Sequence, residues 1–196
     1  HWTYWSAYDF GDSLGAQVVS LSPRRFLQLE VDFLPRDEDG GQVRYLELRA
    51  SAPVATALVG EVWPVAARTG ERTPFRYVLR PTIGAGDPGF DRLEIRSLSI
   101  LGGVTGVRIG DVAVPYAAEE EGPHRLVVSF PRLQAKDSGA LVEVDFEAQV
   151  LRYGASFDAR VADSAQPLEV PQGVVAGDAT GQYDGDRVSV TTAGPA

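Results

Sequence analysis

The sequence contains no cysteine, no methionine and no asparagine, and Lys136 is its only lysine. Without cysteine, the chain can form neither a disulfide bond nor a thiolate metal site. Without asparagine, it has no acceptor for N-linked glycosylation. The shortage of thermolabile residues fits a thermophile, and the excess of arginine over lysine fits a genome rich in G and C equally well.

Long apolar runs and positive charge are also scarce. No stretch approaches the roughly 20 apolar residues that a membrane-spanning helix needs, so we expect no membrane span. The formal net charge is -9, and nucleic-acid binding depends mainly on cationic contacts with phosphates. The composition therefore argues against nucleic acid as a partner.

The chain begins at His1, and without methionine this residue cannot be a translation start. The simplest account is that a secretory leader has been removed, which predicts a secreted, extracellular or cell-surface protein. The alternative is that the chain is a fragment of a longer protein.

The clearest local pattern is the alternation from Val142 to Val150, in which every even position is apolar and every odd position is polar. This period of two is typical of a strand with one buried and one solvated face. Gly154 interrupts the pattern, and a second alternation runs from Phe157 to Val161. We interpret the two stretches as antiparallel strands, joined by a tight corner, at the centre of a sheet.

Short strand patterns recur along the whole chain, and no convincing amphipathic helix interrupts them. Their spacing of about 8 to 12 residues is typical of sandwiches and jelly-rolls. Residues 26–33 and 43–49 predict a hairpin across the charged loop 35–41. We therefore predict an all-β fold, an antiparallel β-sandwich or jelly-roll, which could consist of two packed β subdomains.

Residues 81–89 are the best candidate for a linker, because they hold three glycines and two prolines. This division predicts N-terminal β-hairpins with an aromatic arm in residues 1–80 and a C-terminal β-sandwich in residues 90–196. One continuous domain is the alternative.

Several short motifs together resemble a known kind of module. They are Gly60-Glu61-Val62, Thr73-Pro74-Phe75-Arg76-Tyr77, Gly89-Phe90-Asp91-Arg92-Leu93-Glu94-Ile95, Tyr153-Gly154-Ala155-Ser156-Phe157, Val170-Pro171-Gln172 and Gly177-Asp178-Ala179. The chain resembles uncharacterised β-rich modules of large secreted bacterial surface proteins, which often precede an Ig-like domain similar to that of flagellar hook-capping proteins. The motifs are turns and strand ends without a catalytic signature. The resemblance implies an extracellular β-module and no particular activity.

The first ten residues are unusually aromatic, with Trp2, Tyr4, Trp5, Tyr8 and Phe10 among them. Such a segment rarely remains in water, because each ring offers a large area for burial. It could fold onto the chain's own sheet, or dock on a neighbouring subunit by strand addition. A third interpretation is a platform on which the rings of a polysaccharide stack.

No catalytic constellation stands out, so we expect a protein that is not an enzyme and has no catalytic residues. We predict a structural or interaction module, such as a subunit of an extracellular filament that self-assembles. Its partners would be copies of itself or other surface proteins, with residues 1–10 docking on a neighbour. The alternative is a carbohydrate-binding module that uses the N-terminal aromatic residues.

A copper site is a further alternative, since an N-terminal histidine and a second histidine can form a brace around copper. His1 and His124 are the only histidines. An acidic secreted β-sandwich of this kind resembles the lytic polysaccharide mono-oxygenases in outline, but the sequence around His124 does not match their motifs.

Calcium is the one other cofactor that the sequence suggests, and we otherwise expect none. Asp178, Asp184 and Asp186 share one polar loop, and the loop of Asp37, Glu38 and Asp39 is a weaker candidate. Calcium takes about six to eight oxygen ligands from flexible loops of this kind. A structural calcium site is therefore predicted in residues 177–186.

Overall fold

The computed structural model describes residues 26–31, 43–48, 52–151, 153–181 and 188–193. The chain divides into two compact units, residues 1–51 and residues 52–196. In the first unit, the described residues form no strand, so the predicted hairpin of residues 26–49 is not found among them. All twelve described residues there are exposed, and alternation stabilises a strand only where another layer buries its apolar face.

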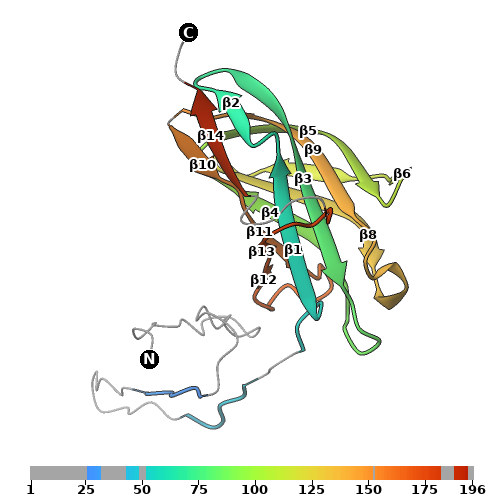
Figure 1. The fold of residues 1–196 in the computed structure, drawn as a ribbon. Helices are drawn as coiled ribbons and strands as arrows, with labels where there is room; N and C mark the ends of the chain where they lie inside the picture. Colours follow the sequence, from blue (N-terminus) through green and yellow to red (C-terminus); the bar gives the residue numbers. More distant parts are fainter. Residues whose placement is uncertain (1–25, 32–42, 49–51, 152, 182–187, 194–196) are drawn as a thin grey trace, which may run out of the picture. The chain divides into compact units, whose positions relative to one another are not determined.

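The second unit is a β-sandwich (Figure 1). Its first sheet has six strands and is antiparallel, except that β13 runs parallel to β1 at one edge. The spatial order is β13(Val175–Ala176), β1(Ala57–Trp63), β3(Arg72–Thr82), β9(Val142–Gln149), β5(Ile100–Ile109) and β6(Val112–Ala113).

The second sheet has five antiparallel strands. Its order is β12(Gln172–Gly173), β11(Asp158–Ala162), β4(Phe90–Arg96), β8(Arg125–Leu133) and β7(Ala117–Glu120). A third sheet holds β10(Gly154–Ser156), β14(Ser189–Ala193) and β2(Ala66–Arg68), with β14 parallel to β2. Only Phe157 separates β10 from β11, and only Pro64 and Val65 separate β1 from β2, so the third sheet joins the other two.

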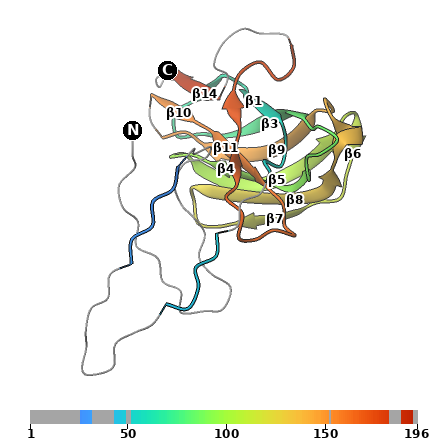
Figure 2. The same cartoon turned by 90° about the horizontal axis from the view of Figure 1, so that it is seen from below.

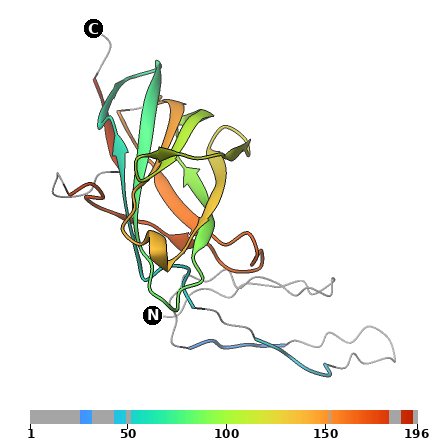
Figure 3. The ribbon, with the colours of Figure 1, turned by 90° about the vertical axis from the view of Figure 1, so that its right-hand side faces the viewer.

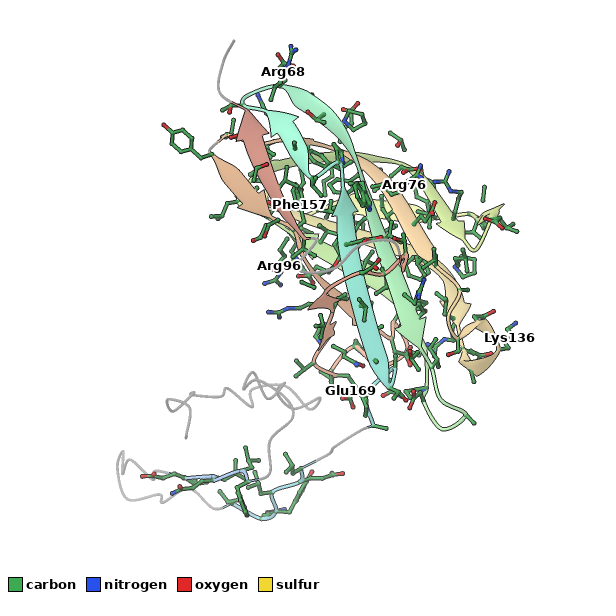
Figure 4. All side chains as sticks on the ribbon, viewed as in Figure 1. Arg68, Arg76, Arg96, Lys136, Phe157 and Glu169 are labelled. Carbon is green, nitrogen blue, oxygen red and sulfur yellow. The ribbon has the colours of Figure 1, made fainter. Side chains whose placement is uncertain are left out.

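The hydrophobic core lies between the sheets. Phe75 of β3, Phe146 of β9 and Phe157 meet there, with ring centroids 5.1 to 6.0 Å apart, and Figure 4 shows Phe157 within the layer of side chains. Burying one such ring contributes roughly 1.5–3 kcal/mol. The even positions from Val142 to Val150 are buried and the odd ones half-buried. Both the alternation and the predicted antiparallel β-sandwich are thus confirmed.

The pairing predicted for residues 142–150 and 157–161 is wrong, because β9 lies in the first sheet and β11 in the second. After Val150 the chain passes from one sheet to the other, and does not join neighbours within one sheet.

Residues 81–89 connect the two large sheets. They lead from the end of β3 in the first sheet to β4 in the second. Within this connection Asp87 accepts hydrogen bonds from the amide of Gly84 at 2.7 Å and from the Thr56 hydroxyl at 2.8 Å. The segment that we expected to link two domains therefore lies inside the second unit, whereas the chain divides after Ser51. Glycine and proline mark sharp changes of chain direction, and these also occur between the layers of one sandwich.

At each side of the sandwich, one short segment contributes an edge strand to both large sheets. On one side, β12 pairs in the second sheet and β13 in the first, with only Val174 between them. On the other side, β6 belongs to the first sheet and β7 to the second. Figures 2 and 3 show the layers from two further directions, with β7 lying outside β8 in Figure 2. One short 3-10 turn, Ala135–Asp137, joins β8 to the loop before β9.

Candidate interaction surfaces

The first candidate surface consists of apolar side chains in the first unit. Eight of the twelve described residues there are large, exposed hydrophobic residues, and they include Phe26 at 76% and Tyr45 at 81% exposure. The other six are Leu27, Leu29, Val31, Val43, Leu46 and Leu48. Exposed apolar residues in such density are typical of contacts with another molecule.

Charged side chains form a second feature, on the outer face of the first sheet. Arg76 of β3 donates from Nε to Oδ1 of Asp145 on β9 at 2.6 Å. Arg108 of β5 donates from Nη2 to Oε2 of Glu143 at 2.5 Å and lies 3.5 Å from Asp145. These four residues, which we call the charge ladder, cross three neighbouring strands. Hydrogen bonding to Asp145 raises the pKa of Arg76.

Glu94 occupies the corresponding outer face of the second sheet, on β4. Arg125 donates from Nη2 to its Oε2 at 2.9 Å, and Arg96 donates to Oε1. Burial on its own would raise the pKa of Glu94, but the hydrogen bonds from Arg125 and then Arg96 outweigh burial, so that the pKa is lowered. The carboxylate is therefore held ionised between the two arginines.

Arg132 and Asp163 fasten the loop after β11 to the end of β8. Arg132 donates two hydrogen bonds to Asp163, one of them from Nη1 to Oδ2 at 3.1 Å. The hydrogen bond from Arg132 is the main reason that the pKa of Asp163 is lowered. Ser164 extends the contact, because its amide donates to Oδ1 of Asp91 at 2.8 Å. The cluster joins three segments and has a structural role.

An open strand edge lies at β7. All four of its residues are exposed, and among the described residues it pairs only with β8. Glu121, just beyond the strand, forms an ion pair with Arg125. In the part of the chain that the structure describes, Glu119 and Glu120 have no such partner. The sequence showed this acidic run, but only the sheet order reveals that it borders an unpaired backbone edge.

Most residues that the sequence singled out for binding lie outside the described residues. This is true of the aromatic set Trp2, Tyr4, Trp5, Tyr8 and Phe10, of His1, and of Asp184 and Asp186. Docking or sugar stacking by the aromatic residues, the copper brace and the calcium site therefore remain predictions.

His124 is described, and it holds two turns together. Its Nδ1 lies 2.9 Å from the carbonyl oxygen of Ser99; since a carbonyl can only accept, Nδ1 carries the proton. The amide of Ser97 donates to the His124 carbonyl at 3.2 Å, and that of Leu101 donates to Pro123 at 2.7 Å. These bonds join the turn before β5 to the turn before β8. Among the described residues, no three His, Asp or Glu side chains gather in a way that could hold a metal ion.

Asp178 is the one described member of the predicted calcium set. Its Oδ1 accepts hydrogen bonds from the amide of Gly181 at 2.7 Å and the hydroxyl of Thr180 at 3.2 Å. The amide of Thr180 donates in turn to Oε1 of Glu61 at 3.2 Å. Glu61 is 0% exposed, and its Oε2 has no hydrogen-bond partner among the described residues. Sequence reasoning missed Glu61, because its position on β1 is one that normally faces solvent.

A shallow hollow lies on the first sheet. It is lined by Arg72, Ile100, Leu101, Gly102, Glu147, Ala148 and Gln149. Arg72 and Glu147 lie 3.5 Å apart across it.

No helix in the described part of the chain is both long and apolar enough to cross a membrane.

Comparison with known proteins identifies no family. No family model and no curated protein matches the chain. The N-terminal domain of the Streptococcus gordonii adhesin Sgo0707 is similar with a TM-score of 0.45 and 10% identity, over 71% of this chain and 33% of that one. The major pilin SpaD from Corynebacterium diphtheriae gives 0.40 and 13%, over 59% of this chain and 33% of the pilin.

A cohesin module of a Clostridium perfringens family 33 glycoside hydrolase gives a TM-score of 0.39 and 11% identity, over 72% of this chain and all of the module. The matches thus span about a third of the adhesin and of the pilin. Two of these three proteins are a bacterial adhesin and a bacterial pilin, but at such scores and identities the matches assign neither a family nor a function to this chain.

Proposed function

We propose that this chain is a non-enzymatic structural module of a secreted or cell-surface bacterial assembly, and that it associates with copies of itself through its N-terminal unit. The observation that supports the proposal is the exposed apolar surface of residues 26–31 and 43–48. Exposing eight large hydrophobic residues over twelve positions is unfavourable in water. A partner that covers them would gain roughly 25 cal/mol for each Å² of apolar surface removed from water.

The second unit supplies a core of its own. Every member of the hydrophobic core lies between Ala55 and Val190. None of the twelve described residues of the first unit is a member of that core, and their apolar side chains remain available for another function. Assembly is the function that we assign to them.

Association by the N-terminal unit would join unlike surfaces of two copies. A segment of one copy would dock on the sandwich of the next, which leaves a free segment and a free acceptor at the two ends of the pair. Such head-to-tail contacts continue into a filament unless the rotation closes a ring. The aromatic arm, residues 1–10, would add to this contact by burying its rings against the neighbouring copy.

The test is to compare the full chain with residues 52–196 by sedimentation velocity over a wide concentration range. The shorter chain should fold, because it retains the whole described core, and remain monomeric. The full chain should form larger species as its concentration rises. A full chain that stays monomeric throughout would contradict the proposal.

Point variants in the full chain sharpen the comparison. Leu27→Lys combined with Leu29→Lys should weaken association without lowering the melting temperature of the sandwich. Val175→Lys is the matched control, since Val175 is an exposed hydrophobic residue of the second unit. Association that is unchanged by the first pair, or equally reduced by the control, would show that these N-terminal residues are not the contact.

A further inference from the structure

The free edge of β7 has the properties of an acceptor for an added strand. Its backbone groups on the side away from β8 have no strand partner among the described residues. Tyr116, immediately before β7, is 41% exposed, and its hydroxyl donates to the carbonyl of Val104 at 3.1 Å. Within the described part of the chain, the edge is thus a backbone without a second strand partner, with small and aromatic side chains at its start and carboxylates at its end.

Charge decides which strand this edge can accept. Glu119 and Glu120 are exposed, and edge strands commonly carry such charges because they prevent like edges from pairing. Two β7 edges would bring four carboxylates together, which disfavours that pairing. A strand that carries positive charge at the matching end would instead be attracted.

The chain itself contains one segment with this pattern. Arg24 and Arg25 immediately precede Phe26, and the alternating residues 26–31 follow. The described part of that segment is fully exposed and forms no strand. It therefore combines a basic start, a strand-like alternation and apolar side chains that lack a buried environment.

We propose that residues 24–31 of a second copy add to β7 as an antiparallel strand. This inference rests on the proposed function, self-assembly through the N-terminal unit, and names the acceptor surface. In an antiparallel pair, the start of the added strand lies beside the end of β7. Arg25 is then opposite Glu119 and Arg24 opposite Glu120.

The same register places two apolar residues beside the two alanines of β7. With Arg25 opposite Glu119, Phe26 falls opposite Ala118 and Leu27 opposite Ala117. Because side chains alternate and Ala118 pairs with the core residue Val128, Phe26 lies on the core face of the sheet and Leu27 on its outer face. The small alanine side chains at the start of β7 leave room for the larger side chains of the added strand. A parallel strand would place the arginines near Ala117 and lose the charge match, so the charge pattern selects one orientation.

A charge-swap experiment on the full chain tests the proposal. One variant carries Glu119→Arg and Glu120→Arg, and the other carries Arg24→Glu and Arg25→Glu. Each should weaken self-association by about tenfold or more, as for reversal of complementary interface charges. An equal mixture of the two variants should associate again, because the basic edge of one accepts the acidic segment of the other.

Asp111→Arg is the control, because Asp111 is an exposed acid in the turn between β5 and β6. It should leave association within about twofold of the unsubstituted chain, as expected for a charge outside the contact. Circular dichroism should show that all variants keep the fold. If the variant with Glu119→Arg and Glu120→Arg does not fold, a variant with Glu119→Gln and Glu120→Gln takes its place.

The outcomes separate this inference from the proposed function. If the full chain associates but is insensitive to Glu119 and Glu120, the N-terminal unit docks elsewhere and the β7 proposal is wrong. If each variant is weakened but the mixture is not restored, the segment and the edge are not direct partners, which also overturns it. If the full chain does not associate at any concentration, both proposals are wrong.

Discussion

Arg76 and Asp145 face each other directly across β3 and β9, with Nε of Arg76 2.6 Å from Oδ1 of Asp145. The register of the two strands sets this contact, because the residues are Cα partners in the ladder. Arg76 also lies 3.7 Å from Glu143, the next polar residue along the same face of β9. One arginine therefore holds two carboxylates of the strand in place.

The contact between Arg76 and Asp145 should make a modest contribution to stability. We expect Arg76→Ala and Asp145→Ala each to lower the free energy of unfolding by about 1 kcal/mol, since both side chains are partly exposed and exposed ion pairs contribute little. The double variant should lose less than the sum of the two, with a coupling of about 0.5 kcal/mol. Urea unfolding of all four proteins measures the coupling, and strict additivity would show that the pair does not interact.

The contact between Arg132 and Asp163 should make stability depend on pH. The pKa of Asp163 is lower in the folded than in the unfolded chain. Its contribution is therefore complete above the unfolded pKa and is lost as the pH falls through the folded pKa. Asp163→Asn should cost about 2 kcal/mol near neutral pH, where a hydrogen-bonded charge is removed.

Unfolding curves at a series of pH values provide the measurement. The chain and the Asp163→Asn variant should differ most near pH 7 and converge at acid pH, as the aspartate of the unsubstituted chain is protonated. A difference between them that is the same at pH 7 and pH 2 would contradict this assignment.

Two glycines with positive φ allow the cost of backbone strain alone to be compared with the cost of strain plus a steric collision. Gly70 has a φ of 80° and Gly89 a φ of 77°. A Cβ at Gly70 would meet nothing within 4 Å, whereas one at Gly89 would collide with the carbonyl oxygen of Leu133. Gly70→Ala should therefore cost only the left-handed penalty of about 1–2 kcal/mol.

Gly89→Ala should be clearly more destabilising, because it adds the displacement of the Leu133 backbone to the same penalty. Thermal unfolding of the two variants side by side gives the comparison. Equal losses would mean that the connection between the sheets moves freely enough to absorb the added methyl group.

The fold was predictable from the sequence where the pattern reports on one local strand. The alternation between Val142 and Val150 directly reflects a strand with one buried face, and the structure confirms it. Residues 26–33 show a similar pattern, but the described part forms no strand. An alternating pattern predicts that one face of a strand can be buried. It does not indicate whether the same unit contains a second layer that buries this face.

The candidate site was less predictable, because it depends on contacts between distant segments. In the sequence, Glu119 and Glu120 are an ordinary acidic run, and only the sheet order shows that they lie on an edge strand. Glu61 likewise has the pattern of an ordinary strand carboxylate, and only the structure shows the hydrogen bond that it accepts from Thr180, more than a hundred residues later in the chain. Neither relationship leaves a local signal in the sequence.

The parallel pair of β2 and β14 has a mechanical consequence. Thr191, Thr192 and Ala193 lie beside Ala66, Ala67 and Arg68 in a ladder that runs the same way in both strands. Pulling the two ends of the sandwich apart acts first on β1, which precedes β2, and then draws β2 toward its start and β14 toward its end. The strands must then slide past each other along their length, so their hydrogen bonds share the load and must break together. Under such tension, the seam between β2 and β14 would act as a clasp that opens only when several hydrogen bonds fail at once.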